Sequence, residues 1–316
     1  MKIVIVEHIT DSGLRILQDS GHEVQYDPEL WADRERLEEA AASAQALIVR
    51  NQARVDASLL AEMEKRTVIG RLGVGLDNID LDEAKRRGIA VIRAKNANAS
   101  SVAEYVLAAI FTFTRPLLAA SDDVKAGNWD RKRFGGHEVA GKTLGLIGVG
   151  EIGHRTAVRA KALGMKVVGS DPQLSAYDFA AAESGIRLAA MEEVLQNSDF
   201  ISLHVPLLPE TKGLIHQAAI EQMQPHAVLI NTSRGGVVDE QALYEALLHK
   251  RIAGAMLDVL SAEPPDPNHP LLSLKNCIIT PHVAGLTEEA NHRTSTLVAS
   301  ELLKELQGVR SLCRVV

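Results

Sequence analysis

The sequence contains little cysteine, no excess of basic residues and no long hydrophobic run. Its 316 residues include two cysteines, Cys277 and Cys313, which have neither the pairing of a disulfide framework nor the spacing of zinc ligands. No hydrophobic segment approaches the roughly 20 residues that a membrane-spanning helix requires. The sequence therefore argues against a disulfide-stabilised protein, a metal centre and a membrane protein.

The charge of the chain excludes a further class of partner. The formal net charge is -7, which argues against nucleic acid or an anionic membrane surface as the main partner. Positive charge that binds an anionic ligand must therefore be local. The apolar start of the chain is broken by Glu7 and His8, so it is too short for the core of a signal peptide. We expect a cytoplasmic protein.

Short β-branched segments alternate with helical ones along the chain, which predicts parallel sheets with helices on both faces. The length and the 46% hydrophobic content predict two soluble domains. Strands are expected at residues 2–7, 23–28, 46–51, 68–73 and 89–94, and in a second series at residues 143–148, 166–171, 200–205, 227–232, 252–260 and 277–282. The predicted fold class is α/β, with two doubly wound parallel-sheet domains of the Rossmann or flavodoxin type.

Two predicted helices flank the second series of strands. Ser101 and Glu104 have the spacing of a capping box, which predicts that an apolar helix begins there. A polar, basic segment at residues 121–142 follows this helix. The last helix, at residues 287–306, is expected to pack against the first domain.

A glycine motif follows the first strand of the second series. Gly148, Gly150 and Gly153 have the G-x-G-x-x-G spacing between a predicted strand and a predicted helix, which is the context that a dinucleotide site requires. The helix N-terminus there offers free N–H groups and the positive end of a dipole to a pyrophosphate. Asp171 ends the next strand and is placed to accept from a ribose 2'-hydroxyl, which favours NAD over NADP. The alternative is a tight turn with a surface aspartate.

A second glycine pair, Gly73 and Gly75, also follows a predicted strand. It lacks the third glycine, and no acid ends a matching second strand, so it is a poor dinucleotide site. Such a turn can direct backbone N–H groups at a carboxylate. An ordinary turn fits the residues equally well.

Three polar residues of the second series lie just after strands, where parallel sheets bind their ligands. They are Arg234, Glu263 and His282. Histidine transfers protons near neutral pH, and a neighbouring carboxylate would orient it and favour its charged form. Arginine binds a carboxylate through two parallel hydrogen bonds. Together they could protonate a carbonyl during hydride transfer and hold a 2-keto acid. Singly, each could be a structural or solvated residue.

These residues and the segments "GVGEIG", "HVPLLPETKGLI", "INTSRGGVVDEQAL", "DVLSAEPP" and "PHVAGLT" resemble the D-isomer-specific 2-hydroxyacid dehydrogenases, over nearly the whole chain and in the family's order. The resemblance implies a catalytic set of Arg234, Glu263 and His282. It implies an NAD-binding domain at residues 98–283, inserted between two parts of a substrate domain at residues 1–97 and 284–316. It also implies a homodimer.

The resemblance further implies which residues contact the ligands. The implied cofactor contacts are Gly148, Gly150, Glu151, Ile152, Gly153, Asp171, Val205, Pro206, Thr211, Thr232, Ser233, Asp258, His282 and Gly285, with Asp258 near the nicotinamide carboxamide. The loop Gly73, Val74 and Gly75 would bind the substrate carboxylate together with Arg234. Arg50 and Arg54, just after a strand of the first domain, could bind a second anionic group of the substrate.

Within the family, the chain looks most like short 3-phosphoglycerate dehydrogenases. Arg131 matches a position that reaches a neighbouring subunit's site in that subfamily, although its surroundings could equally be a solvated basic run. The chain ends soon after its last helix, so the regulatory serine-binding domain of many such enzymes is expected to be absent. Hydroxypyruvate, glyoxylate or sulfolactate stay open as substrates. A non-catalytic NAD-responsive binding protein is the rival of another class, and formate oxidation is disfavoured because it needs no Glu–His pair.

Overall fold

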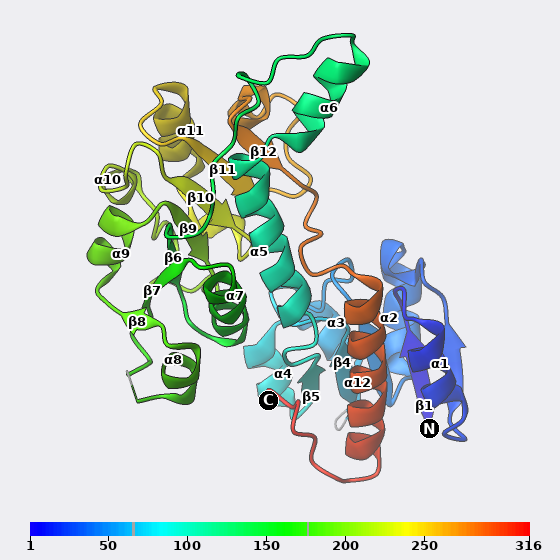
Figure 1. The fold of residues 1–316 in the computed structure, drawn as a ribbon. Helices are drawn as coiled ribbons and strands as arrows, with labels where there is room; N and C mark the ends of the chain where they lie inside the picture. Colours follow the sequence, from blue (N-terminus) through cyan, green and yellow to red (C-terminus); the bar gives the residue numbers. More distant parts are fainter. Residues whose placement is uncertain (65–66, 176) are drawn as a thin grey trace. The chain divides into compact units, whose positions relative to one another are not determined.

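The chain is divided into two structural units, each built on its own parallel sheet (Figure 1). A computed structural model describes residues 1–64, 67–175 and 177–316. Unit 1 comprises Met1–Asn98 and Leu286–Val316, and unit 2 comprises Ala99–Gly285. Among the residues that the structure describes, every strand pair of the two sheets is parallel, so the prediction of two doubly wound α/β domains is confirmed.

The sheet of unit 1 has the strand order β2-β1-β3-β4-β5, the flavodoxin-like order. Its strands are β1 (Lys2–Ile5), β2 (Glu23–Tyr26), β3 (Ala46–Val49), β4 (Val68–Arg71) and β5 (Ala90–Arg93). Its helices are α1 (Asp11–Gln18), the 3-10 helix η1 (Leu30–Ala32), α2 (Arg34–Ala42), α3 (Ala57–Glu62), α4 (Leu81–Arg87) and α12 (Glu288–Leu306). Strands β1 and β3 to β5 are almost entirely buried, as expected for a parallel sheet covered on both faces.

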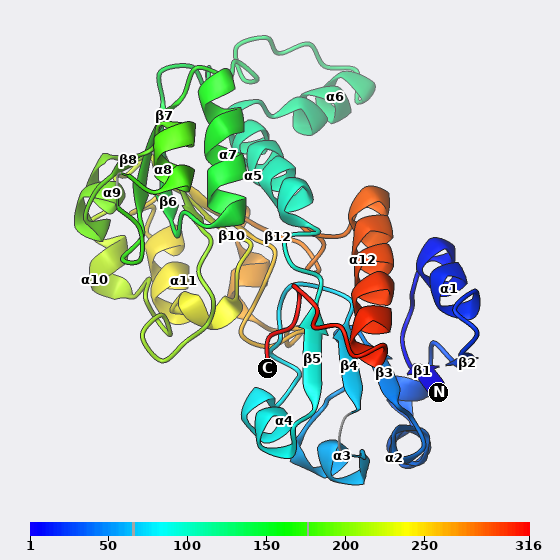
Figure 2. The same ribbon diagram turned by 90° about the horizontal axis from the view of Figure 1, so that it is seen from below.

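Successive strand residues of unit 1 point to opposite faces and form two cores. On one face, Ile3, Ile5 and Ile48 pack with Leu17 of α1 and with Val298 and Leu302 of α12. On the other face, Val4, Leu47 and Ile69 pack with residues of α2, α3 and α4. Figure 2 shows α1 and α12 on one side of the strands and α2, α3 and α4 on the other. The expected packing of the last helix against the first domain is therefore confirmed.

The sheet of unit 2 has the order β12-β11-β10-β9-β6-β7-β8. Its strands are β6 (Thr143–Ile147), β7 (Lys166–Ser170), β8 (Arg187–Leu188), β9 (Phe200–Leu203), β10 (Val228–Asn231), β11 (Gly254–Leu257) and β12 (Cys277–Ile279). Its helices are α5 (Ala99–Thr114), α6 (Leu117–Lys125), α7 (Glu151–Ala162), α8 (Phe179–Ser184), α9 (Met191–Asn197), α10 (Gln217–Ile220), η2 (Gly235–Val237), α11 (Glu240–Leu248) and η3 (Pro270–Ser273). The order reverses between β6 and β9, which is where such sheets bind ligands.

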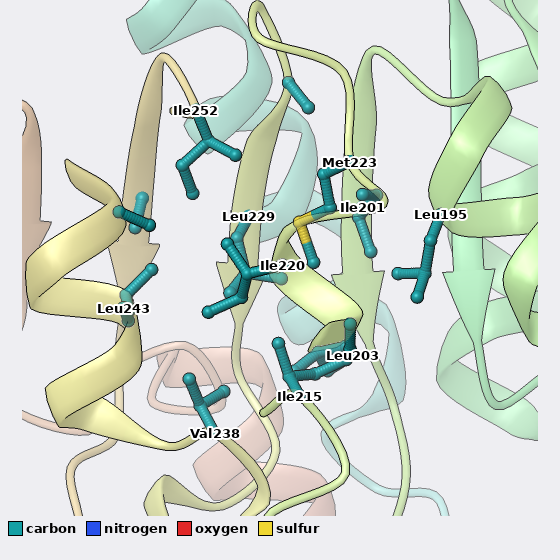
Figure 3. Close-up of a cluster of buried hydrophobic side chains, with 14 of the residues drawn as sticks. Leu195, Ile201, Leu203, Ile215, Ile220, Met223, Leu229, Val238, Leu243 and Ile252 are labelled. Carbon is teal, nitrogen blue, oxygen red and sulfur yellow. The ribbon is translucent and has the colours of Figure 1, made fainter. Parts of the chain in front are cut away.

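Two cores also hold unit 2 together. Helices α5 and α7 cover one face, where Ile110 and Ala157 pack with Leu146 and Ile230 of the strands. Helices α9, α10 and α11 cover the other, and Figure 3 shows Leu195, Ile220 and Leu243 from these helices around Ile201 and Leu229. The carboxyl ends of the strands are thus fixed by packing on both sides.

Some local predictions differ from the structure. The prediction that a capping box at Ser101 starts the helix is wrong. Helix α5 begins at Ala99, and Ser101 is buried within its first turn. The basic segment at residues 121–142 is in part helical, since α6 extends to Lys125. Strand β8 is two residues long and was not predicted. Among the described residues, no single helix is long and apolar enough to cross a bilayer, and the bent pair α5–α6 meets that test only when joined.

Candidate active site

The glycine-rich loop after β6 contributes to the lining of a pocket in unit 2. Gly148 has a φ of 90°, and a Cβ there would lie 2.5 Å from the carbonyl oxygen of His204, so this turn requires glycine. Gly150 precedes α7, and a Cβ added to it would meet no atom within 4 Å. The backbone before α7 is therefore open to a ligand, and the 12 residues of α7 direct their dipole at this point.

The pocket beside this loop has a volume of about 620 Å³, within the range of small-molecule sites. Gly150, Glu151, Arg155 and Asp171 are among its lining residues. The Asp171 carboxylate accepts hydrogen bonds from the backbone N–H groups of Val149 (2.9 Å) and Gln173. It is held at the end of β7, with lone pairs left for a hydroxyl.

Glu151 gives the pocket a charge that does not match a pyrophosphate. It is the first residue of α7, where a carboxylate suits the helix dipole but repels a phosphate. Its Oε2 atom lies 3.3 Å from Nη2 of Arg155, one turn further along the helix. The nearby cation partly offsets the acid. Glu151 therefore lines the pocket, but the charge of its side chain is ill suited to direct contact with a phosphate.

Glu263 and His282 are brought together by the structure. Nδ1 of His282 lies 2.8 Å from Oε2 of Glu263, and Oε1 of Glu263 accepts from the backbone N–H of Leu260 at 3.1 Å. When Nδ1 carries a hydrogen and donates it to this carboxylate, Nε2 is left for a substrate. Both side chains are exposed, at 51% for His282 and 36% for Glu263. The pair can orient the imidazole and still admit a ligand.

Arg234 follows β10 on a turn that packs against the segment leading to Glu263. A Cβ at Gly235 would lie 2.0 Å from the backbone carbon of Leu260, so glycine permits this close approach. Nη1 of Arg234 donates to the carbonyl of Ser233 (2.6 Å), and the side chain of Asn231 donates to the carbonyl of Arg234. The turn holding Arg234 is thus fixed by its own strand end.

The other predicted cofactor residues of unit 2 lie on α7 or on the loops after the strands. Ile152 and Gly153 belong to α7, while Val205, Pro206 and Thr211 follow β9, Thr232 and Ser233 follow β10, Asp258 follows β11, and Gly285 follows β12. The Oγ1 atom of Thr232 is buried without a hydrogen-bond partner, which is rare unless a ligand or water completes it. This orphaned hydroxyl and the open backbone at Gly150 fit a bound dinucleotide.

His204 lies beneath the glycine-rich loop, next to Gly148 and Gly153. Its Nε2 atom is 3.1 Å from Oγ of Ser202, and its Nδ1 atom is buried without a partner. Burial lowers the pKa of His204 to about 4, so the ring is neutral at physiological pH. It acts as a packing residue beneath the loop.

In unit 1, Arg50 is strongly fixed while Arg54 is not. The backbone N–H of Arg50 donates to Glu7, and its Nη2 atom donates to Oδ1 of Asn291 at 2.7 Å. Burial lowers the pKa of Arg50, and the charge of Glu7 opposes that shift. The side chain of Arg54 is 83% exposed, and its Nε atom lies 4.0 Å from Oδ2 of Asp56.

Sequence reasoning missed two further arginines at the same sheet edge of unit 1. Arg71 ends β4 and Arg93 ends β5, and the two are partners in the parallel register. The guanidinium of Arg71 occupies the space beside Gly73, where a Cβ would lie 1.4 Å from its Nη1 atom. Val74 and Gly75 continue that loop. Both arginines stand at the ends of parallel strands, where such sheets bind their ligands, so this sequence signal is present in the first series of strands as well as in the second.

Arg131 belongs to unit 2. It lies in an exposed segment after α6, beside Trp129, which is 76% exposed. Within the described ranges no group of three potential metal ligands occurs.

Comparison with known proteins identifies the family. The family described as "D-isomer specific 2-hydroxyacid dehydrogenase, NAD binding domain" matches residues 107–284, which lie within unit 2. The (S)-sulfolactate dehydrogenase of Chromohalobacter salexigens is 42% identical over 311 residues, which are 98% of this chain and 100% of that protein. The D-3-phosphoglycerate dehydrogenase of Methanocaldococcus jannaschii is 41% identical over 309 residues, and this chain spans 58% of its length.

A solved structure agrees with the sequence relatives. The apo-structure of D-lactate dehydrogenase from Escherichia coli superposes with a TM-score of 0.84 at 30% identity, with 100% of both chains covered. The sequence relatives and the similarity of fold therefore agree. The chain belongs to the D-isomer-specific 2-hydroxyacid dehydrogenase family, and unit 2 contains its NAD-binding domain.

Proposed function

We propose that the protein interconverts a small 2-hydroxy acid and its 2-keto acid with NAD. The observation that carries the proposal is the hydrogen-bonded pair of Glu263 and His282, which lies at the same sheet edge as the glycine-rich loop. When bound, the nicotinamide supplies the hydride acceptor or donor. The chain's own residues then have to bind the acid and move one proton.

The proton is assigned to Nε2 of His282. During reduction, the imidazole donates to the carbonyl oxygen of the keto acid, and during oxidation it takes that proton back. Glu263 orients the ring and stabilises its charged form during this transfer. Arg234 binds the substrate carboxylate through paired hydrogen bonds. Asp171 accepts from the ribose hydroxyls and disfavours a 2'-phosphate.

This function is tested by comparing the turnover of the wild-type protein with that of a variant that lacks the His282 imidazole. NADH oxidation with pyruvate, hydroxypyruvate, glyoxylate and sulfopyruvate, and NAD reduction with 3-phosphoglycerate, measure the activity. His282→Ala should lower turnover roughly 10²- to 10⁴-fold, the usual contribution of general acid–base catalysis. The matched control is His249→Ala, since His249 also pairs with a glutamate, Glu245, but at the C-terminal end of helix α11. Equal turnover of the two variants would remove His282 from the mechanism.

The identity of the substrate is a separate proposal. We propose an acid with a second anionic group, such as 3-phosphoglycerate or sulfolactate, because Arg50 is fixed at a sheet edge that also carries Arg71 and Arg93. Sulfolactate and phosphoglycerate dehydrogenases are among the relatives. Preference for pyruvate or glyoxylate in the panel would contradict the second anionic site.

The alternative to an enzyme is a protein that binds NAD(H) but catalyses no reaction. It would bind NADH, detected by fluorescence, and turn over no 2-keto acid. The exposed Glu263–His282 pair argues against it, because a purely structural role does not need an accessible imidazole.

We also propose that the protein is a homodimer in the cytoplasm. Helix α6 presents Leu117, Leu118 and Val124 to solvent, and Trp129 follows it. Such a patch is typical of an interface. A partner bound there would lie near the segment that carries Arg131, which follows Trp129 by two residues in the sequence. Both cysteines are free and buried, as suits a reducing compartment. Sedimentation equilibrium would show a monomer mass if the dimer is wrong.

A further inference from the structure

A chain of hydrogen bonds connects helix α5 to the loop that carries His282. The hydroxyl of Tyr105 is hydrogen-bonded to Oγ1 of Thr280, and Oγ1 of Thr280 donates to Oδ1 of Asp258 at 2.6 Å. Tyr105 lies on α5, Asp258 follows β11, and Thr280 follows β12. A residue of α5, 175 positions earlier in the chain, is therefore linked to the ends of two neighbouring strands, at a point two residues before His282.

The direction of these hydrogen bonds is fixed by the chemistry of the groups. Asp258 is 1% exposed, and as a carboxylate it can only accept. Thr280 has one hydroxyl hydrogen and uses it toward Asp258, so it must accept from Tyr105. Burial and the charge of Asp258 raise the pKa of Tyr105, while its hydrogen bond to Thr280 lowers it. The phenol therefore keeps its hydrogen at neutral pH and is the donor that begins the chain.

Asp258 in turn holds three consecutive backbone N–H groups. Its carbonyl accepts from His282 at 2.9 Å, and its carboxylate accepts from Val283 at 2.8 Å and from Ala284 at 2.7 Å. His282 has a φ of 55°, in the left-handed region that a non-glycine residue rarely adopts. Such a conformation persists only when its surroundings enforce it. The Asp258 carboxylate, fixed by Thr280, supplies that enforcement.

We propose that Tyr105 is a positioning residue that acts through Thr280 and Asp258 to hold the His282 loop in its reactive conformation. The proposal rests on the proposed function, because it assigns His282 the proton transfer. Tyr105 touches neither the imidazole nor Glu263 in this chain of contacts, so its loss should remove no hydrogen bond of the pair directly. The loop would then sample other backbone conformations, and the imidazole would be misplaced for part of the time.

The first consequence concerns activity. Tyr105→Phe removes one hydrogen bond and keeps the ring, so kcat should fall about three- to ten-fold, as for one lost hydrogen bond. The factor should be the same for pyruvate and hydroxypyruvate, because the loop acts on the common carbonyl, and KM should change little. The matched control is Tyr244→Phe on α11, whose half-buried ring packs against the other core of unit 2. That variant should keep wild-type kcat.

A double-mutant cycle separates positioning from general packing. Thr280→Val removes the hydroxyl that joins Tyr105 to Asp258, and Thr280→Ser restores it. If Tyr105 acts through Thr280, Tyr105→Phe should cost nothing further in the Thr280→Val protein. Thr280→Ser should recover most of the activity. Additive losses in the double variant would overturn the proposal, because they mean that Tyr105 acts by another route.

Amide hydrogen exchange tests the loop without relying on turnover. In Tyr105→Phe, a peptide covering residues 281–285 should exchange faster than in the wild type, while peptides of β6 and β10 should not change. Unaltered exchange at residues 281–285 would refute the positioning role. If the wild type turned over no 2-keto acid but the exchange changed as expected, the proposed function would fail and the link from Tyr105 to the loop would stand.

Discussion

Replacement of Glu7 by glutamine should strongly destabilise unit 1, although the two side chains have nearly the same shape. Glu7 is buried, with 3% of the residue exposed. Oε1 accepts from the backbone N–H groups of Arg50 and Ala53, at 2.6 and 3.0 Å, and Oε2 accepts from those of Asn51 and Gln52, at 3.0 and 2.9 Å. One carboxylate thus satisfies four consecutive donors, and each bond is charge-assisted.

The magnitude follows from the chemistry of the amide. A glutamine keeps one acceptor oxygen, but its NH₂ group would face two N–H donors that then have no partner. Each lost bond to a charged group costs about 1.5–3 kcal/mol, so Glu7→Gln should cost roughly 3–6 kcal/mol. That is a large part of the about 5–15 kcal/mol that stabilises a typical domain. The exposed Glu62 of α3 provides the control, and Glu62→Gln should change stability by less than about 0.5 kcal/mol.

Urea unfolding followed by tryptophan fluorescence measures this effect. The chain has two tryptophans, and Trp129→Phe leaves Trp31 of unit 1 as the sole reporter. In that background, Glu7→Gln should lower the urea midpoint with an unchanged slope. A midpoint equal to that of Glu62→Gln would refute the reasoning. If Arg50 binds the substrate's second anionic group, KM for sulfopyruvate should also rise more than KM for pyruvate.

Three other predictions concern unit 2. Asp171→Asn should relax the preference for NADH over NADPH, measured as a ratio of kcat/KM, and an unchanged ratio would count against the ribose contact. Glu151→Gln should tighten NADH binding about two- to five-fold, the size of a surface charge interaction. Fluorescence titration should show that gain shrinking at high salt, and no gain at low salt would contradict it. The pKa of His204 is lowered to about 4, so below about pH 6.5 the unfolded chain binds a proton that the folded state does not. His204 should therefore reduce the free energy of unfolding by about 2 kcal/mol between pH 7 and pH 5, and His204→Gln should flatten that dependence in urea titrations.

The sequence predicted all strands of the two sheets except β8, because most of these parallel strands are buried on both faces. Such strands read as short, continuous hydrophobic runs, and the segment at residues 46–49 is buried at every position. Strand β8 was missed because its two residues, Arg187 and Leu188, carry no such run. The capping box failed for another reason: Ser101 has the right spacing, but α5 starts earlier and buries it.

The site was predictable where it depends on the order of elements along the chain. Glu263 and His282 follow two adjacent strands, so the sheet brings them within hydrogen-bonding distance. Tyr105 and Thr280 could not be paired in this way, because they are separated by 175 residues and meet only through the packing of α5. The four donors around Glu7 depend likewise on the path of a loop that no short motif encodes.

The hydrogen bonds of Asp258 change how a variant of this residue should be interpreted. A carboxylate has about four acceptor positions, and Thr280, Val283 and Ala284 occupy three of those of Asp258. Its replacement would disturb the His282 loop whether or not it also contacts the nicotinamide carboxamide. Lost activity in an Asp258 variant therefore cannot distinguish cofactor binding from loop positioning. Tyr105→Phe can, since it alters the support of Asp258 while leaving the carboxylate and its remaining acceptor position in place.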